Sequence, residues 1–254
     1  MINLSVIIIT LNEEKNISRC IESVKKVADE IIVVDSFSTD RTKEIAVRLG
    51  AKFITNAFKG HIEQKNFGLA QCSNHIVLSL DADEELSEEL IQSILEAKHN
   101  WKYDGYYMNR LNRFCGKWIK HSGWYPDKKI RLFDKRSGQW GGTNPHDKFI
   151  PNKNASIGPL KGDLLHYTIN SIEEQIKQNN YFSSIAANMA YDKGKRSSLF
   201  LILLSPLFKF IRNYFFKLGI LDGYFGFVIC INTAHETFLK YIKLRELQKN
   251  KKTL

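Results

Sequence analysis

Residues 75–85 read H-I-V-L-S-L-D-A-D-E-E, an apolar run that ends in two carboxylates, Asp81 and Asp83. The run His75–Leu80 does not alternate between polar and apolar residues, which predicts a strand covered on both faces, as in a parallel sheet. Ser87–Ala97 then has the spacing of a helix, with its first serine at the N-cap. This order of strand, acidic turn and helix indicates an α/β fold.

The same alternation fills the residues before this stretch. The predicted strands are Leu4–Thr10, Glu30–Asp35 and Ala51–Thr55, and the predicted helices are 13–28, 41–49 and His61–Cys72, with Gly50 as a C-cap. Repeated β-α units imply a mostly parallel sheet with right-handed crossovers and flanking helices. Because ligands of such sheets lie beyond the carboxyl ends of the strands, we expect Thr10–Glu13, Asp35 and Asp81–Asp83 along one edge.

Beyond residue 100 the regularity weakens. Tyr106–Asn112 and Lys129–Phe133 are predicted strands, separated by the aromatic and basic stretch Phe114–Tyr125. From Ser171 the chain is predicted to be helical to its end. We therefore expect an α/β domain over residues 1–170, with halves 1–100 and 101–170, and a helical extension over 171–254.

The overall composition is that of a globular protein with an unusual charge. The chain has 254 residues, 43% hydrophobic residues and a formal net charge of +10, which favours anionic partners such as nucleic acid, phosphorylated substrates or an anionic membrane. Its four cysteines have no metal-finger spacing, so we expect reduced thiols in a cytosolic protein. Met1–Thr10 lacks the pattern of a signal peptide.

The pair Asp81 and Asp83 has two interpretations. Carboxylate oxygens suit a hard cation such as Mg²⁺ or Mn²⁺, and two protein ligands leave positions for phosphate oxygens. The alternative is a solvated acidic turn before the next helix. The position after a buried strand, at the same edge as Thr10 and Asp35, favours the cation.

The other strand ends carry groups that suit a nucleotide. Thr10-Leu11-Asn12-Glu13 offers hydroxyl, amide and carboxylate groups to a base or ribose, or else Asn12 simply caps the following helix. Asp35 has the chemistry to accept a hydrogen bond from a pyrimidine ring N–H. Lys65 is predicted either to meet a phosphate or to lie on a solvated helix face.

The ordered series T-L-N-E-E, V-V-D-S-x-S-x-D, G-x-x-x-Q-K-N and D-A-D-E resembles the family 2 glycosyltransferases of GT-A fold, over the first hundred residues. Asn112–Asp134 and the later K-L-G-I-L-D-G-Y-F-G-F extend the resemblance over nearly the whole chain. These stretches are similar to the branch that includes lipopolysaccharide-core β-1,4-glucosyltransferases.

The resemblance implies roles for these residues. Thr10, Asn12, Glu13 and Asp35 would hold the uridine of a nucleotide sugar, with Leu11 in the same turn. Lys65 would lie near the base or diphosphate, Asp81 near the ribose or a metal ion, and Asp83 on that ion, Mg²⁺ or Mn²⁺. The donor implied is UDP-glucose, with UDP-N-acetylhexosamines next, and the acceptor is a bacterial cell-surface glycan or a lipid-linked saccharide.

Enzymes of this kind invert the anomeric centre, which needs a carboxylate to take the acceptor proton. We expect Asp147, in N-P-H-D, to be this base, with Glu84 and Glu85 as rivals. The family members that this chain resembles have V-H-E at this place. Asp147 is one methylene shorter than a glutamate, and a proline precedes His146, so the distance over which the carboxylate can reach the acceptor differs from the family pattern.

Residues later in the chain are predicted to complete the site. His166 either joins the metal ligands or is a structural histidine at the end of an apolar strand. Trp124, Tyr125, Arg131 and His146 are expected to line the acceptor cleft, because aromatic faces stack on sugars and Arg matches phosphate or carboxylate. A packed aromatic core is the competing interpretation.

The segment 193–217 combines large apolar residues with lysines and arginines. No uninterrupted apolar run reaches the roughly 18 residues of a membrane span, and Pro206 is expected to break the longest one. The pattern favours a peripheral contact with the anionic inner face of the cytoplasmic membrane. A homo-oligomer interface or burial in the core are the alternatives.

Other function classes fit less well. A nucleotidyltransferase of related fold would need a Gly-rich phosphate loop after the first strand, and a dinucleotide-dependent oxidoreductase would need G-x-G-x-x-G there. The chain has no recognised nucleic-acid-binding module, so nucleic acid is not expected as a partner. A protein that binds nucleotide sugars or glycans without catalysis remains open.

Overall fold

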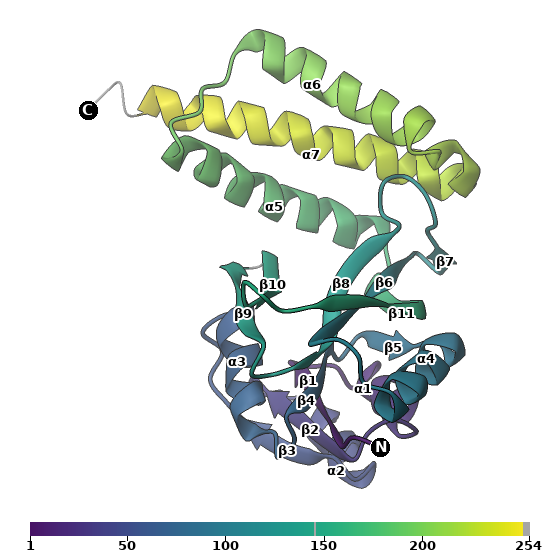
Figure 1. Ribbon diagram of the computed structural model, residues 1–254. Helices are drawn as coiled ribbons and strands as arrows, with labels where there is room; N and C mark the ends of the chain where they lie inside the picture. Colours follow the sequence, from purple (N-terminus) through teal and green to yellow (C-terminus); the bar gives the residue numbers. More distant parts are fainter. Residues whose placement is uncertain (145, 251–254) are drawn as a thin grey trace. The chain divides into compact units, whose positions relative to one another are not determined.

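The computed structural model describes residues 1–144 and 146–250, without the side chains of His146 and Asn250. The chain forms two compact units. Unit 1 comprises Met1–Arg110 and Asp127–His166, and unit 2 comprises Leu111–Pro126 and Tyr167–Leu254 (Figure 1). Unit 2 thus includes residues 111–126, which the sequence-based division at residue 170 assigned to the first domain.

A mixed sheet is the framework of unit 1. Its parallel part consists of β1 (Leu4–Thr10), β2 (Glu30–Asp35), β3 (Lys52–Thr55) and β4 (Ile76–Asp81), in the order β3-β2-β1-β4. The order continues through β8 (Asp127–Asp134), β6 (Gly105–Phe114), β11 (Ile157–Ile169) and β5 (Glu84–Leu86), and β7 (Lys117–Trp118) pairs with β6. The expectation of a mostly parallel sheet in the first hundred residues is confirmed.

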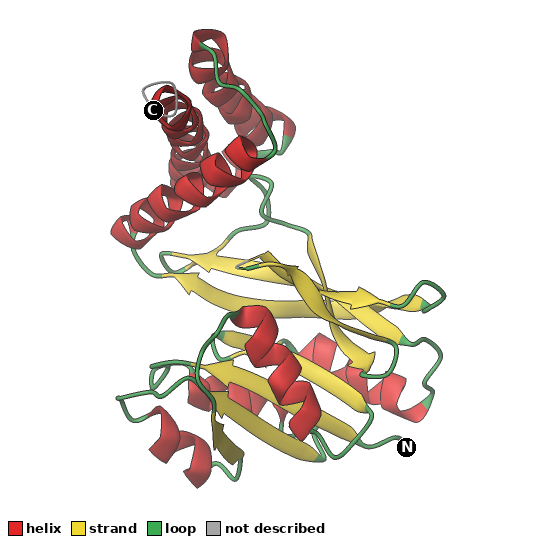
Figure 2. Ribbon diagram, turned by 90° about the vertical axis from the view of Figure 1, so that its left-hand side faces the viewer, coloured by secondary structure: helices red, strands yellow, loops and turns green. Residues whose placement is uncertain are grey.

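The strand register aligns the polar ends. Thr10 of β1 pairs with Asp35 of β2, and Ile9 of β1 pairs with Asp81 of β4. All seven residues of β1 are buried, because helices cover both faces of the sheet (Figure 2). The carboxyl ends of β1, β2 and β4 therefore lie along one edge of the sheet, as the sequence predicts.

The helices of unit 1 are α1 (Ile17–Val24), α2 (Thr42–Arg48), α3 (His61–Gln71) and α4 (Glu88–His99). Ser87 caps α4 by accepting a hydrogen bond from the Leu90 amide, as the sequence predicts. Helix α1 is shorter than the predicted 13–28. Residues 14–16 form a turn before it, in which the Asn16 and Ile17 amides both donate to the Glu13 carbonyl.

A two-stranded hairpin of β9 (Gly138–Thr143) and β10 (His146–Pro151) has no counterpart in the predictions. Asn66 of α3 fixes it, because its side chain accepts from the Trp140 amide at 3.1 Å and donates to the Trp140 carbonyl at 3.0 Å. Phe149 stacks on Phe133 of β8, with ring centroids 3.7 Å apart. The hairpin thereby brings Asp147 into unit 1.

Unit 2 contains α5 (Ile172–Asp192), α6 (Leu199–Ile211), α7 (Gly223–Asn250) and two short turns, η1 (Arg212–Phe216) and η2 (Gly219–Asp222). Helix α7 packs against both α5 and α6 (Figure 1). Asp222 ties residues 117–122 to these helices. Its carboxylate accepts from the Lys120 and His121 amides and from the Ser122 hydroxyl, and its carbonyl accepts from Lys117.

One prediction for this unit is wrong. Pro206 does not end the apolar helix, which runs through it to Ile211 and continues as a wider turn to Phe216. A proline removes one backbone hydrogen bond, and here the N-cap Ser198 and the packing on α7 maintain the helix. By length and composition alone, Leu199–Phe216 is therefore apolar enough to cross a membrane.

Candidate active site

Local hydrogen bonds join the loops that follow β1 and β2. Asp35 is 2% exposed and accepts hydrogen bonds from the amide and hydroxyl of Ser38. The Asn12 amide donates to the same hydroxyl at 2.8 Å, and the Asn12 side chain accepts from the Thr39 amide. The predicted nucleotide-binding residues of two strands are thus linked through the loop after β2.

Glu13 connects these loops to the end of β4. Burial raises the pKa of its carboxyl group, the hydrogen bond from Asn16 partly opposes this, and the nearby carboxylate of Asp83 raises it further. Leu11 is half exposed and Thr10 is buried. The turn after β1 therefore lies beside the acidic turn, as the sequence predicts.

Asp81 lies between two cations. Its carboxylate oxygens are 3.0 Å from the Lys65 amine and 2.8 Å from the Arg131 guanidinium. Burial raises the pKa of Asp81, but Arg131 and Lys65 together hold it well below its usual range. Oδ2 accepts a hydrogen bond from Arg131, whereas the buried Oδ1 forms an ion pair with Lys65 but has no hydrogen-bond partner among the described residues.

Glu84 belongs to the same network of ion pairs, in which its role is structural. Its fully buried carboxylate binds Arg131 at 2.7 Å, lies 3.6 Å from Arg110, and accepts from the Asp81 amide. Burial would lower the pKa of Arg131, but Asp81 and Glu84 raise it above its usual range. Glu85, the other rival for the base, lies 3.6 Å from Arg19.

Lys65 also binds Asp147, the predicted base. The amine is 2.7 Å from Asp147 Oδ2 and 4.5 Å from the centre of the Trp140 ring, and its side chain is only 2% exposed. Arg131 lies 5.5 Å from the centre of the same ring. A continuous series of charges thus joins Asp147, Lys65, Asp81 and Arg131 around one tryptophan.

These groups surround a pocket of about 440 Å³. The lining is strongly basic, and its charged members are Lys65, Asp81, Arg110, Lys128, Lys129, Arg131, Asp147 and Lys148. Lys129 and Arg110 both bind Asp127, at 3.1 and 2.8 Å. Lys128 and Lys148 are exposed at the rim. The pocket therefore offers a carboxylate beside a surplus of positive charge.

Asp83 and His166 form a second pair. The register of β5 with β11 aligns Glu84 with His166, and His166 Nε2 is 3.1 Å from Asp83 Oδ2. Neighbouring ligands of an octahedral ion bound at about 2.1 Å are about 3.0 Å apart, so this pair fits two adjacent positions on a divalent cation. No cluster of three or more His, Cys, Asp or Glu suited to a metal occurs in the described residues, so a cation here would take further ligands from the substrate.

The predicted acceptor residues are divided. Arg131 is in unit 1, buried and bound to Asp81 and Glu84. Trp124 and Tyr125 are in unit 2, where Trp124 packs edge-on against Phe114 in an apolar cluster. His146 begins β10, and its side chain lies outside the described part of the chain.

Trp140 and Arg110 line the pocket and Asn66 holds the Trp140 backbone, but the sequence analysis missed all three. Asn66 was quoted only as part of the Q-K-N motif. Its position directly after Lys65 was the available signal for a second role, the docking of the β9–β10 hairpin. Arg110 lies in a predicted strand and Trp140 in a stretch with no local pattern, and only the tertiary fold brings them to Glu84 and Lys65.

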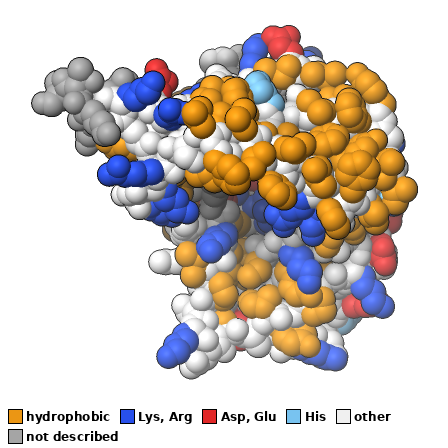
Figure 3. All heavy atoms as spheres, turned by 90° about the horizontal axis from the view of Figure 1, so that it is seen from above, with side chains coloured by type: hydrophobic (Ala, Val, Ile, Leu, Met, Phe, Trp, Pro, Cys, Tyr) orange, Lys and Arg blue, Asp and Glu red, His pale blue; other side chains and the backbone are white. Residues whose placement is uncertain are grey.

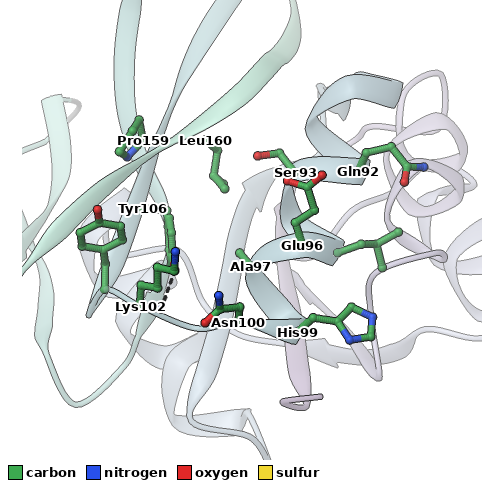
Figure 4. A pocket seen from close by; sticks show the side chains of 12 residues that line it. Gln92, Ser93, Glu96, Ala97, His99, Asn100, Lys102, Tyr106, Pro159 and Leu160 are labelled. Atoms are coloured by element: carbon green, nitrogen blue, oxygen red, sulfur yellow. Dashed lines mark hydrogen bonds between the residues drawn. The ribbon is translucent and has the colours of Figure 1, made fainter.

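A larger hollow of about 800 Å³ lies on α4 and includes Glu96, His99 and Tyr106 (Figure 4). None of the predicted site residues lines it. Its side chains come from α4, the following loop, β6 and β11. The chemistry therefore concentrates in the smaller pocket at Lys65.

Residues 5–156, more than half of the chain, match the family model for Glycosyl transferase family 2. The chain belongs to glycosyltransferase family 2. It is 38% identical to a protein of Rickettsia typhi described as an uncharacterized glycosyltransferase, over 97% of this chain and 88% of the relative. It is 30% identical to the lipopolysaccharide core biosynthesis glycosyltransferase LpsC of Rhizobium meliloti, over 95% and 91% of the two chains.

The fold of this family 2 glycosyltransferase agrees with that membership. The glucosyl-3-phosphoglycerate synthase of Mycobacterium tuberculosis, solved with Mn²⁺, uridine diphosphate and its glucosyl product, superposes with a TM-score of 0.50 at 17% identity. The match covers 78% of this chain and 82% of that one. The predicted GT-A fold, with its mostly parallel sheet and helical C-terminal part, is confirmed.

Proposed function

We propose that this glycosyltransferase transfers a sugar from a nucleotide-sugar donor, with UDP-glucose as the first candidate, to a lipopolysaccharide-core or other cell-surface saccharide. The observation that carries the proposal is the series Asp81, Lys65 and Asp147 along a pocket, next to the Asp83–His166 pair. The pocket supplies a carboxylate for an incoming hydroxyl, and the pair supplies cation ligands for a diphosphate. The similarity to LpsC supports the class of acceptor.

The donor's uridine is assigned to the turn after β1 and to Asp35. Thr10 Oγ1 is buried and has no hydrogen-bond partner among the described residues, a cost that a bound nucleotide would remove. Glu13, Asn12 and Leu11 lie in the same turn, and Lys65 follows in α3. The mycobacterial structure with uridine diphosphate supports the same class of donor.

A divalent cation, Mg²⁺ or Mn²⁺, is assigned to Asp83 and His166. Such an ion would offset the negative charge that grows on the leaving diphosphate. Asp81 is assigned to orient Lys65 and Arg131 through its ion pairs, while its buried Oδ1, which has no hydrogen-bond partner among the described residues, is assigned to the ribose or the ion. The Mn²⁺ in the mycobacterial enzyme supports this class of ion.

Asp147 is assigned as the base. Its carboxylate takes the proton of the acceptor hydroxyl as that oxygen bonds to the anomeric carbon, while the bond to the diphosphate breaks and its electron pair leaves with the diphosphate. Lys65 holds one carboxylate oxygen at 2.7 Å and so fixes the orientation of the base. A single displacement of this kind inverts the anomeric configuration.

The exposed lysines at the rim of the pocket influence which acceptor the site favours. Lys128 and Lys148 border the pocket that contains Asp147, and both are exposed. Positive charge around an acceptor site favours saccharides that carry phosphate or carboxylate groups. Trp124, Tyr125 and His146 remain proposed acceptor contacts.

The direct test is a donor screen with Mn²⁺, Mg²⁺ or a chelator. Wild-type protein is incubated with UDP-glucose, UDP-N-acetylglucosamine and other nucleotide sugars, and release of the nucleoside diphosphate is measured with and without core saccharides. Transfer that needs the cation supports the proposal. Nucleotide binding without any turnover would favour a non-catalytic binding protein. In a separate incubation with a nucleoside triphosphate and a sugar phosphate, release of pyrophosphate would favour a nucleotidyltransferase.

We also propose that the protein is cytoplasmic and peripheral on the inner face of the membrane.

A further inference from the structure

An unusually large set of apolar side chains is exposed on unit 2. Thirteen large hydrophobic residues between positions 199 and 231 are exposed: Leu199, Phe200, Leu203, Leu207, Phe208, Phe215, Phe216, Leu218, Ile220, Leu221, Tyr224, Phe227 and Ile231. They come from α6, the η1–η2 corner and the first turns of α7, and are named here the apolar face. Figure 3 shows hydrophobic side chains gathered over a broad area of this side of the protein.

The face arises because α6 is apolar at all but two positions, Ser205 and Lys209, not counting Pro206, and buries little of its surface. Only Ile202 of its 13 residues is buried, although the helix packs against α7. On α7 the exposed residues Tyr224, Phe227 and Ile231 are spaced by three and four, so they form one stripe. A soluble monomer does not usually keep so many contiguous apolar side chains in water, so the face indicates a partner.

Positive charge flanks the apolar face at both ends of α6. Lys193, Lys195 and Arg196 precede the helix, and Arg212 and Lys217 follow it, all of them exposed. An apolar surface with a basic margin matches the boundary of an anionic bilayer, where acyl chains take the apolar groups and headgroups take the cations. A protein partner would not require basic residues at both margins.

The charged residues of α7 indicate whether α6 lies on the membrane or crosses it. Residues 199–216 would be about 27 Å long at 1.5 Å per residue, close to the roughly 30 Å of a hydrocarbon core, so length alone allows a span. But α6 packs along α7, which carries Glu236, Lys240 and Lys243. A spanning α6 would draw such charges into hydrocarbon, which is costly.

We propose that the apolar face inserts into the interfacial layer of an anionic membrane, with α6 parallel to the surface and the apolar side chains of the η1–η2 corner inserted beside it. Phe216 and Leu221, which are 79% and 63% exposed, are the main anchors at that corner. The flanking lysines and arginines contact lipid phosphates. The proposal is independent of the sugar chemistry, since the contact needs neither nucleotide sugar nor metal.

The test is co-sedimentation of the full chain with vesicles of phosphatidylcholine containing 30% phosphatidylglycerol, without donor or cation. The double variant Phe216→Ser/Leu221→Ser is expected to lower the vesicle partition coefficient at least tenfold. Arg212→Gln/Lys217→Gln is expected to lower it several-fold and to weaken its dependence on salt. Wild-type binding to pure phosphatidylcholine vesicles is expected to be weaker than to the anionic ones.

The matched control is Tyr181→Ser on α5, which removes an aromatic side chain that is 60% exposed but lies outside the apolar face. It should bind vesicles like the wild type, and thermal melting of every variant checks that it is folded. Equal binding of Phe216→Ser/Leu221→Ser and wild type would overturn the proposal. So would a wild type that ignores vesicles but forms a dimer that this variant dissolves, and so would membrane association that resists alkaline carbonate, which indicates a span.

Discussion

The two units differ in the side chains that they bury. Unit 1 buries charged side chains, whereas unit 2 leaves apolar side chains exposed. In unit 1 every residue of β1 is buried, and even the charged side chains of Lys65 and Glu84 are 2% and 0% exposed. In unit 2 only Ile202 of α6 is buried, and Phe216 is 79% exposed. Burying a charged side chain and exposing an apolar one both lower the stability of the folded protein. Each unit therefore has a region in which binding has been favoured over stability.

The largest effect is expected in unit 1, from Asp147→Asn. Loss of a general base typically lowers the rate about 10² to 10⁴-fold, while the neutral amide still accepts a hydrogen bond from Lys65. We expect kcat to fall by this factor and nucleotide binding, measured by calorimetry, to persist. Asp134→Asn, at the end of β8 and paired with Arg136, is the control and should keep its turnover. Near-normal turnover of Asp147→Asn would refute the assignment of the base.

The next effect concerns stability, from Asp81→Asn. Removing one partner of a buried ion pair costs about 3–5 kcal/mol, and we expect about 3 because Lys65 keeps Asp147 and Arg131 keeps Glu84. Urea unfolding at neutral pH measures this loss. The surface pair Arg41–Glu44 offers a control, since Glu44→Gln should leave the unfolding midpoint nearly unchanged.

The same variant tests a pH dependence. Because the pKa of Asp81 in the folded protein is depressed, its stabilisation is complete above the unfolded value of about 3.9 and is lost as the pH falls through the folded pKa. We expect the wild type to lose unfolding free energy below about pH 4. Asp81→Asn should lose less over that range, and an identical acid slope in both proteins would argue against the Asp81 ion pairs.

Asp222→Ala probes the interior of unit 2. The substitution removes the acceptor for two amides and the Ser122 hydroxyl, and each buried donor left unpaired costs about 1–3 kcal/mol, less where water enters. We expect about 2–3 kcal/mol and faster proteolysis near residues 117–122, with nucleotide binding retained. Asp192→Ala, at the exposed end of α5, should match the wild type.

The smallest effect is expected from Phe216→Ser, which sharpens the contrast between the units. Its side chain is already in water, so the unfolding free energy should change by no more than about 0.5 kcal/mol. Leu78→Ala, at a fully buried position of β4, should cost about 2–5 kcal/mol. A large loss of stability in Phe216→Ser would mean that the apolar face is covered within the folded chain.

The sequence analysis was most accurate where the signal is local. The strands of the parallel sheet, the N-cap at Ser87 and the shared edge of Thr10, Asp35 and Asp81 were all predicted. It was wrong about Pro206, because packing on α7 outweighs the loss of one backbone hydrogen bond. It gave no sign of the β9–β10 hairpin, whose position depends on Asn66, about 75 residues earlier.

Local periodicity was enough to predict the α/β class and the two acidic residues after β4, since both depend on residues close in sequence, and the ordered motifs carried the resemblance to family 2 glycosyltransferases. The partners of those two acidic residues were decided by tertiary structure. Asp81 faces Lys65 and Arg131, while Asp83 faces His166, and these partners come from α3, β8 and β11. The same holds for the apolar face, because composition gives the number of apolar residues and only packing decides which of them remain in water.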